Sequence, residues 1–134
     1  MTLTSLRPAG QMMAYLPSPN VEALAELLIA FANSDGGTVV VGADEKGHIT
    51  QGLYPDEIEG TLRAASRKCR PVIPVNWDQM ETPGGTVFAI TVARSPELHS
   101  LDDGGVRILM GAENRPLAGD EIRQLGATKS AADF

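Results

Sequence analysis

The sequence predicts an α+β domain with a mixed, mostly antiparallel sheet, two main helices and a short C-terminal helix. Apolar residues recur at helical spacing over residues 21–33, which is typical of an amphipathic helix. The runs 38–42 and 86–92 are rich in β-branched residues, which favour strands. Proline- and glycine-rich breaks separate these segments, giving the order β-α-β-β-α-β-β-β-α. A chain of 134 residues is long enough to bury one real core.

The first part of the chain is predicted to contain a tail, a strand and a helix. Residues 1–9 are interpreted as an N-terminal tail, and the domain is expected to span residues 10–126. A short strand is predicted over 11–16. A helix then follows over 21–33, with Asn20 as the N-cap that accepts from a free amide of the first turn. Its buried face is expected to carry Val21, Leu24, Leu28 and Phe31.

The helix is predicted to lead through paired glycines directly into a strand. Gly36 or Gly37 is expected to take the left-handed conformation that closes the helix. The apolar run 38–42 indicates a central strand covered on both faces. A hairpin turn is predicted over 44–47 and a short returning strand over 48–53. These residues alone describe a helix–turn–strand junction without chemistry.

The second half is predicted to hold a helix, three strands and a final short helix. The helix begins at Pro55, where a missing N–H has no cost, and stops before Pro71. Pro74 indicates an edge position or a bulge for the strand that contains it. The predicted elements are strands over 72–80, 86–92 and 106–110, a hairpin turn over 82–85, loops over 95–105 and 111–116, a helix over 117–125 and a C-terminal tail over 127–134.

The net charge limits the classes of molecule that the chain can bind, and the cysteine content indicates its cellular compartment. The formal net charge is −6, so binding to nucleic acid would need a local basic patch against the overall field. The lone Cys69 excludes an internal disulfide and favours a reducing cytoplasm. We see no leader and no apolar run long enough to span a bilayer, and expect no membrane contact.

Four of the chain's 11 basic residues fall within eight positions, Arg63, Arg67, Lys68 and Arg70. Three of them, at i, i+4 and i+7, are expected to share one helix face. One interpretation is a stripe that contacts phosphates. The alternative is a solvated face paired with Glu57 and Glu59.

The residues of three other candidate sites do not support a metal, catalytic or phosphate-binding function. With two histidines and one cysteine a zinc site is not expected, and His99 is interpreted as a hydrogen-bonded loop residue. Ser100, His99 and Asp102 are neighbours in sequence without a nucleophile elbow, so no catalytic triad is predicted. Gly36-Gly37 precedes a strand rather than a helix, so it is not a phosphate loop. No cofactor and no metal is expected.

The chain resembles the AlbA_2 domain of bacterial regulators and Schlafen proteins, a DNA-binding module. The resemblance covers residues 11–125 and rests on three stretches. They are Ala30-Phe31-Ala32-Asn33-Ser34-Asp35-Gly36-Gly37 with the following valine strand and Gly42, then Gly47 through Gly52-Leu53, and then Gly111-Ala112-Glu113-Asn114-Arg115-Pro116-Leu117 with Glu121-Ile122.

The resemblance implies a basic contact surface at the third stretch. The family favours Arg two residues before the distal glycine, where this chain has Leu109, with Arg107 two residues back on the same strand face. Asn114 and Arg115 on the distal loop are candidates for phosphate or base-edge contacts. Equally, Arg115 ties the loop to Asp120 or Glu121.

The resemblance also bears on catalysis. Nuclease-active Schlafens hold a metal with two glutamates ahead of the first helix and an acidic residue after the glycine-flanked strand. Here residues 11–16 carry no carboxylate, and only Asp44 or Glu45 matches the last position. One carboxylate does not make a divalent-cation site, and Asp44 is interpreted as a turn residue.

Three functions are therefore considered. The first is a non-catalytic module that binds DNA or RNA through the basic residues of 63–70 and of the distal loop. The second is a self-assembling scaffold on the same fold, and in either case we expect a homo-oligomer. The third is a metal-dependent nuclease, which the missing carboxylates disfavour.

Overall fold

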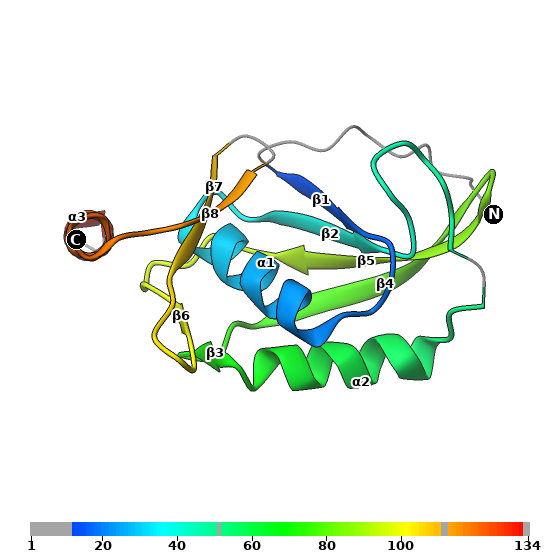
Figure 1. Ribbon diagram of the computed structural model, residues 1–134, viewed down its shortest axis with the longest axis horizontal. Coiled ribbons are helices and arrows are strands. Elements are labelled where there is room, and N and C mark those ends of the chain that lie inside the picture. Colours follow the sequence, from blue (N-terminus) through cyan, green and yellow to red (C-terminus); the bar gives the residue numbers. More distant parts are fainter. Residues whose placement is uncertain (1–11, 51, 111–112, 133–134) are drawn as a thin grey trace.

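A four-stranded sheet forms the centre of the molecule in a computed structural model that describes residues 12–50, 52–110 and 113–132 (Figure 1). Its strand order is β1-β2-β5-β4. β1 pairs with β2 in parallel, and the other two pairings are antiparallel. The predicted α+β class with a mixed, mostly antiparallel sheet is confirmed. These strands are β1 (Met13–Leu16), β2 (Gly37–Val41), β4 (Val75–Thr82) and β5 (Gly85–Val92). The predicted tail 1–9 and the start of the first predicted strand lie outside the described residues.

Two helices cover one face of this sheet, α1 (Val21–Asn33) and α2 (Pro55–Ser66) (Figure 1). β2 lies between β1 and β5, and its three valines are 0–2 % exposed. Val39 and Val41 belong to the main core under the helices, whereas Val40 packs with Ala43 and Val87 in a second, smaller cluster. Because neighbouring side chains of a strand point to opposite faces, β2 is covered on both faces, as predicted.

The ends of α1 are built from local chemistry that the sequence shows. The Asn20 side chain accepts a hydrogen bond from the Ala23 amide at 2.9 Å, so the predicted N-cap is confirmed. At the other end the amides of Ser34 and Gly36 both donate to the Phe31 carbonyl, at 3.1 and 2.9 Å. Gly36 has φ +76°, which is the left-handed conformation predicted for the helix closure.

Position 37 requires glycine because the Phe31 ring lies against it and because of its backbone angle. Its φ is +154°, and a Cβ there would lie 2.5 Å from the Phe31 ring. The chain can therefore pass from α1 into β2 only where a side chain is missing. This junction sets the position of α1 on the sheet.

Two small strand pairs lie outside the main sheet, and both correct the predicted loops. β3 (Cys69–Arg70) pairs with β6 (Ser100–Leu101), which falls inside the predicted loop 95–105. β7 (Arg107–Met110) pairs with β8 (Glu113–Pro116), which falls inside the predicted loop 111–116. β7 matches the predicted strand over 106–110, whereas β3, β6 and β8 are only two to four residues long and carry no local strand pattern.

The other elements differ from prediction mainly at their ends. The predicted strand over 48–53 is wrong in the described part, where Ile49 makes an isolated bridge to Ala43. β4 begins at Val75 rather than 72, directly after Pro74, which has no N–H for a sheet. β4 is an edge strand, as Pro74 indicated.

The last helix is longer than predicted. α3 (Gly119–Ala132) continues well past the expected end at 125, through most of the predicted tail 127–134, and residues 133–134 lie outside the described part. The physical reason is an anchor near its end. The Lys129 ammonium is buried and donates to the carbonyls of Ala32 at 3.4 Å and Ser95 at 2.6 Å. A cation at the C-terminal end of α1 also complements the helix dipole.

Candidate nucleic-acid interface

The predicted contact residues form two groups on either side of α1. Arg63 is on α2, Arg67 and Lys68 follow it, and Arg70 is in β3, whereas the second group lies on the β7–β8 hairpin. α1 contacts both α2 and β7, and Figure 1 shows it between them. The second group consists of Arg107, Asn114 and Arg115.

The predicted helical stripe is corrected in part. α2 ends at Ser66, so Arg67 caps the helix and Arg70 leaves it for β3. The three arginines are still all exposed. Arg63 forms a long, solvent-exposed ion pair with Glu59 at 3.6 Å, one of the two partners that the alternative interpretation named.

Arg67 and Arg70 differ from the rest of the set. Within the described residues, neither guanidinium lies within ion-pair distance of a carboxylate. Arg70 Nη1 donates to the carbonyl of Arg67 and, at 3.1 Å, to that of Cys69. These bonds hold the Arg70 side chain against the end of α2, and no carboxylate of the described residues forms an ion pair with it. The two guanidiniums are therefore available to an external anion.

Lys68 and Arg107 are paired with carboxylates on α1. Lys68 Nζ lies 3.0 Å from Glu22 Oε1, and this hydrogen bond raises the pKa of the Lys68 ammonium. Arg107 Nη2 lies 3.3 Å from Glu26 Oε1. Arg107 Nη1 also donates to the Asn114 carbonyl at 3.4 Å, across the β7–β8 hairpin. Neither pairing was predicted from the sequence.

Arg115 makes one of the two ties that the sequence allowed. Its Nη2 lies 2.8 Å from Glu121 Oε2, and Glu121 Oε1 accepts from the Ala118 amide at 3.2 Å. The hydrogen bond from Arg115, followed by that from Ala118, lowers the pKa of Glu121. The side-chain oxygen of Asn114 is buried without a hydrogen-bond partner among the described residues. Arg115 thus connects β8 to the first turn of α3.

A buried amide that sequence reasoning missed positions the second group. Asn33, at the end of α1, accepts from the His99 amide at 2.8 Å. Its Nδ2 donates to the carbonyls of His99 at 2.9 Å and Arg107 at 3.1 Å. The sequence places Asn33 only at the end of the predicted helix 21–33, within the first stretch that resembles the family. One signal in the sequence points to this role. Asn33 follows the apolar run that ends at Ala32, and an amide buried at such a place needs several hydrogen-bond partners.

His99 is a hydrogen-bonded loop residue, as predicted. It is 2 % exposed, with Nδ1 2.8 Å from the Pro71 carbonyl and Nε2 2.7 Å from Ser95 Oγ. Together with Asn33 it ties the 95–99 loop to the end of α1 and to the segment after β3. The role of this network is to hold loops in place.

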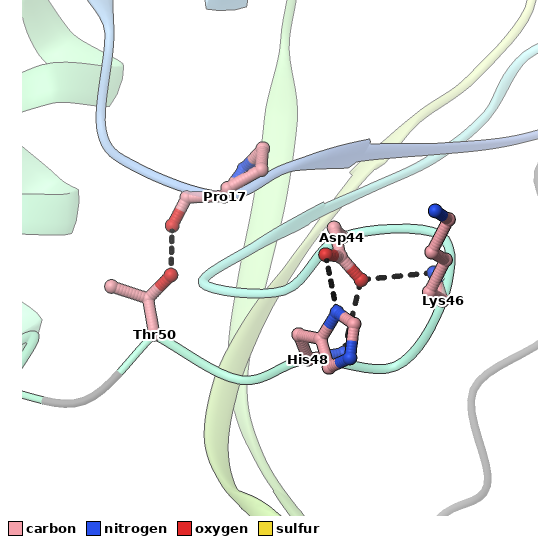
Figure 2. Close-up of polar contacts among 5 residues, drawn as sticks. All are labelled: Pro17, Asp44, Lys46, His48 and Thr50. Atoms are coloured by element: carbon pink, nitrogen blue, oxygen red, sulfur yellow. Dashed lines mark hydrogen bonds and ion pairs between the residues drawn. The ribbon is translucent and has the colours of Figure 1, made fainter.

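Asp44 organises a turn, as predicted (Figure 2). Its Oδ1 accepts from the amides of Lys46 at 2.9 Å and His48 at 3.0 Å, and its Oδ2 lies 2.9 Å from His48 Nδ1. The amide of His48 is the largest cause of the lowered pKa of Asp44. Over the described residues, no group of three or more His, Cys, Asp or Glu side chains gathers in a way that would hold a metal ion.

Two further findings concern the sequence expectations. Cys69 is buried, and desolvation raises the pKa of its thiol to about 11, so it is a core residue rather than a nucleophile. In the part of the chain that the structure describes, no helix combines the length and apolar character needed to cross a bilayer.

Comparisons with known proteins agree with this architecture. The crystal structure of the DIP2311 protein from Corynebacterium diphtheriae is similar, with a TM-score of 0.65 and 22% sequence identity. The match covers 89% of this chain and 24% of that protein, so the chain spans about a quarter of its length. At this identity the likeness shows the fold. No curated protein matches the chain. The family model described as Schlafen, AlbA_2 matches residues 12–118, and the chain belongs to this family.

Proposed function

We propose that this domain is a non-catalytic DNA-binding module that contacts the phosphate backbone through the end of α2. The observation that carries the proposal is the pair of exposed guanidiniums of Arg67 and Arg70, which form no ion pair with any of the described residues. Arg63, whose exposed pair with Glu59 is long, lies one turn before Arg67. Such surface pairs are weak, so phosphate can displace the carboxylate. Membership of the Schlafen, AlbA_2 family also supports the proposal, because this chain resembles the DNA-binding AlbA_2 domain of bacterial regulators.

The proposal predicts binding that depends on salt and not on sequence. Each phosphate neutralised by a cation contributes about 0.9 to the slope of log K against log salt for duplex DNA. Fluorescence anisotropy with a labelled 20-base-pair duplex at about 50 and 200 mM salt measures that slope. Arg67→Glu with Arg70→Glu should lower the slope by about two and the affinity at 50 mM by at least about tenfold.

A matched control separates the local patch from overall charge. Lys46→Glu with Arg123→Glu makes the same change of charge in the turn after β2 and on α3. Lys46 and Arg123 are both exposed. Equal losses in the two double variants would contradict a site at the end of α2. A single-stranded RNA of the same length shows whether RNA is the preferred ligand. Magnesium- or manganese-dependent cleavage that Asp44→Ala abolishes would overturn the non-catalytic role.

A second candidate function, self-assembly, is favoured by β4. This strand has eight residues and lies at the edge of the sheet, and no other strand of the described residues pairs with its outer side. An open edge of this length is a template for pairing with a second copy. Size-exclusion chromatography with light scattering tests it. Gln79→Lys, in the middle of the edge, should dissociate an oligomer, whereas Gln124→Lys on exposed α3 should not.

A further inference from the structure

Two more of the predicted contact residues, Lys68 and Arg107, are cations that pair with carboxylates of α1. Lys68 lies directly after Arg67, and Arg107 lies on β7, on the other side of α1. Their partners Glu22 and Glu26 are four residues apart on α1, so they lie on one face of it, one turn from each other. Figure 1 shows α1 between α2 and β7, and the two carboxylates of α1 each pair with one of these cations.

We propose that Glu22 and Glu26 occupy Lys68 and Arg107 in place of DNA phosphates, so that α1 masks half of the binding surface in the free protein. This inference rests on the proposed function. A carboxylate and a phosphate offer the same kind of oxygen acceptor to an ammonium or a guanidinium. Glu22 and Glu26 thus occupy the donor groups of Lys68 and Arg107 that a phosphate would take.

The exposure of the four side chains supports exchange. The Glu22 side chain is 74% exposed and that of Lys68 29%, so the carboxylate can leave into water while the ammonium stays near α1. Arg107 is 25% exposed and keeps its second bond, to the Asn114 carbonyl, when Glu26 moves away. The Glu26 side chain is 33% exposed, so the carboxylate is much more solvated than the cation only in the pair of Glu22 with Lys68.

Masking makes the full set of contacts depend on the ligand. Arg67 and Arg70 supply the first contact, and Lys68 and Arg107 join only when a ligand displaces Glu22 and Glu26. DNA that fits all four cations gains two further phosphate contacts. An anion that contacts only the end of α2 gains neither of these two contacts.

Removing the two carboxylates tests the inference on the full chain. Glu22→Gln with Glu26→Gln should bind the labelled duplex about two- to thirtyfold more tightly than the wild type at 50 mM salt, because DNA no longer has to displace two exposed ion pairs. The slope of log K against log salt should stay close to that of the wild type, because both proteins make the same phosphate contacts once DNA is bound. Each single variant should show a smaller part of the gain in affinity. Unfolding curves confirm that the variants are folded.

The control removes two acids that hold no cation. Glu45→Gln with Glu97→Gln changes the net charge equally, and both residues are exposed and outside the ion pairs of the described structure. The inference is overturned if the Glu22 and Glu26 variant matches this control in affinity. If the wild type does not bind but that variant does, masking stands and the proposed function of the wild type fails. If no variant binds, both fail.

Discussion

Replacing Asn33 by aspartate tests the junction on which the position of β7 depends. The substitution keeps the shape of the side chain and the acceptor for the His99 amide. It replaces the Nδ2 donor by an oxygen that faces two carbonyls, at 2.9 and 3.1 Å. Two hydrogen bonds of about 1 kcal/mol each are lost. The buried carboxylate against two carbonyl oxygens adds about 1–3 kcal/mol, for a total of about 3–5 kcal/mol at pH 7.

The loss should depend on pH with a defined sign. Burial and two facing carbonyls raise the pKa of the introduced carboxyl in the folded state above its unfolded value near 4. The folded protein then binds more protons than the unfolded chain at pH above about 4, so its stability falls as pH rises. Near pH 4 the protonated group donates to one carbonyl, and part of the stability returns.

Thermal unfolding followed by circular dichroism at pH 4.5 and 7 measures both effects. We expect Tm at pH 7 to fall by about 11–18 °C, and the difference from wild type to narrow at pH 4.5. Asn20→Asp is the matched control, because aspartate is as good an N-cap as asparagine and the site is exposed. An Asn33→Asp protein as stable as this control at pH 7 would refute the reasoning.

Three further predictions concern the same region of the molecule. Gly37→Ala should destabilise by about 2–4 kcal/mol in urea unfolding, because its Cβ would meet the Phe31 ring, whereas Gly47→Ala, with open space around it, should lose only about 1 kcal/mol. Lys129→Met should increase amide hydrogen exchange in α3, since its ammonium would no longer bind two carbonyls; unchanged exchange would show that the helix is held by its apolar contacts. Cys69 should react with a thiol reagent at pH 8 only as fast as the protein unfolds, and rapid labelling of the native state would contradict its burial and raised pKa.

The sequence predicted the elements whose signals are local. The spacing of Leu24, Leu28 and Phe31 defined α1, and Asn20 and Gly36 defined its ends. The valines of β2 showed that the strand is covered on both faces. In each case the physical cause lies within a few neighbouring residues, so the pattern can be recognised without the fold.

The elements that were missed depend on contacts distant in sequence. β6 is a strand only because Ser100 and Leu101 meet β3, and α3 stays ordered past 125 because Lys129 reaches the end of α1. The contact residues follow the same rule. The tie of Arg115 to Glu121 was foreseeable from their spacing. Those of Lys68 to Glu22 and of Arg107 to Glu26 required the packing of α1 against its neighbours.

The anchor in α3 has a practical consequence for choosing where the domain ends. The family match stops at residue 118, yet α3 begins at Gly119 and returns to the junction through Lys129. A protein shortened to the matched residues would leave the carbonyls of Ala32 and Ser95 without this donor, beside the glycines that β2 starts from. Recombinant work on this domain should therefore extend to at least residue 132.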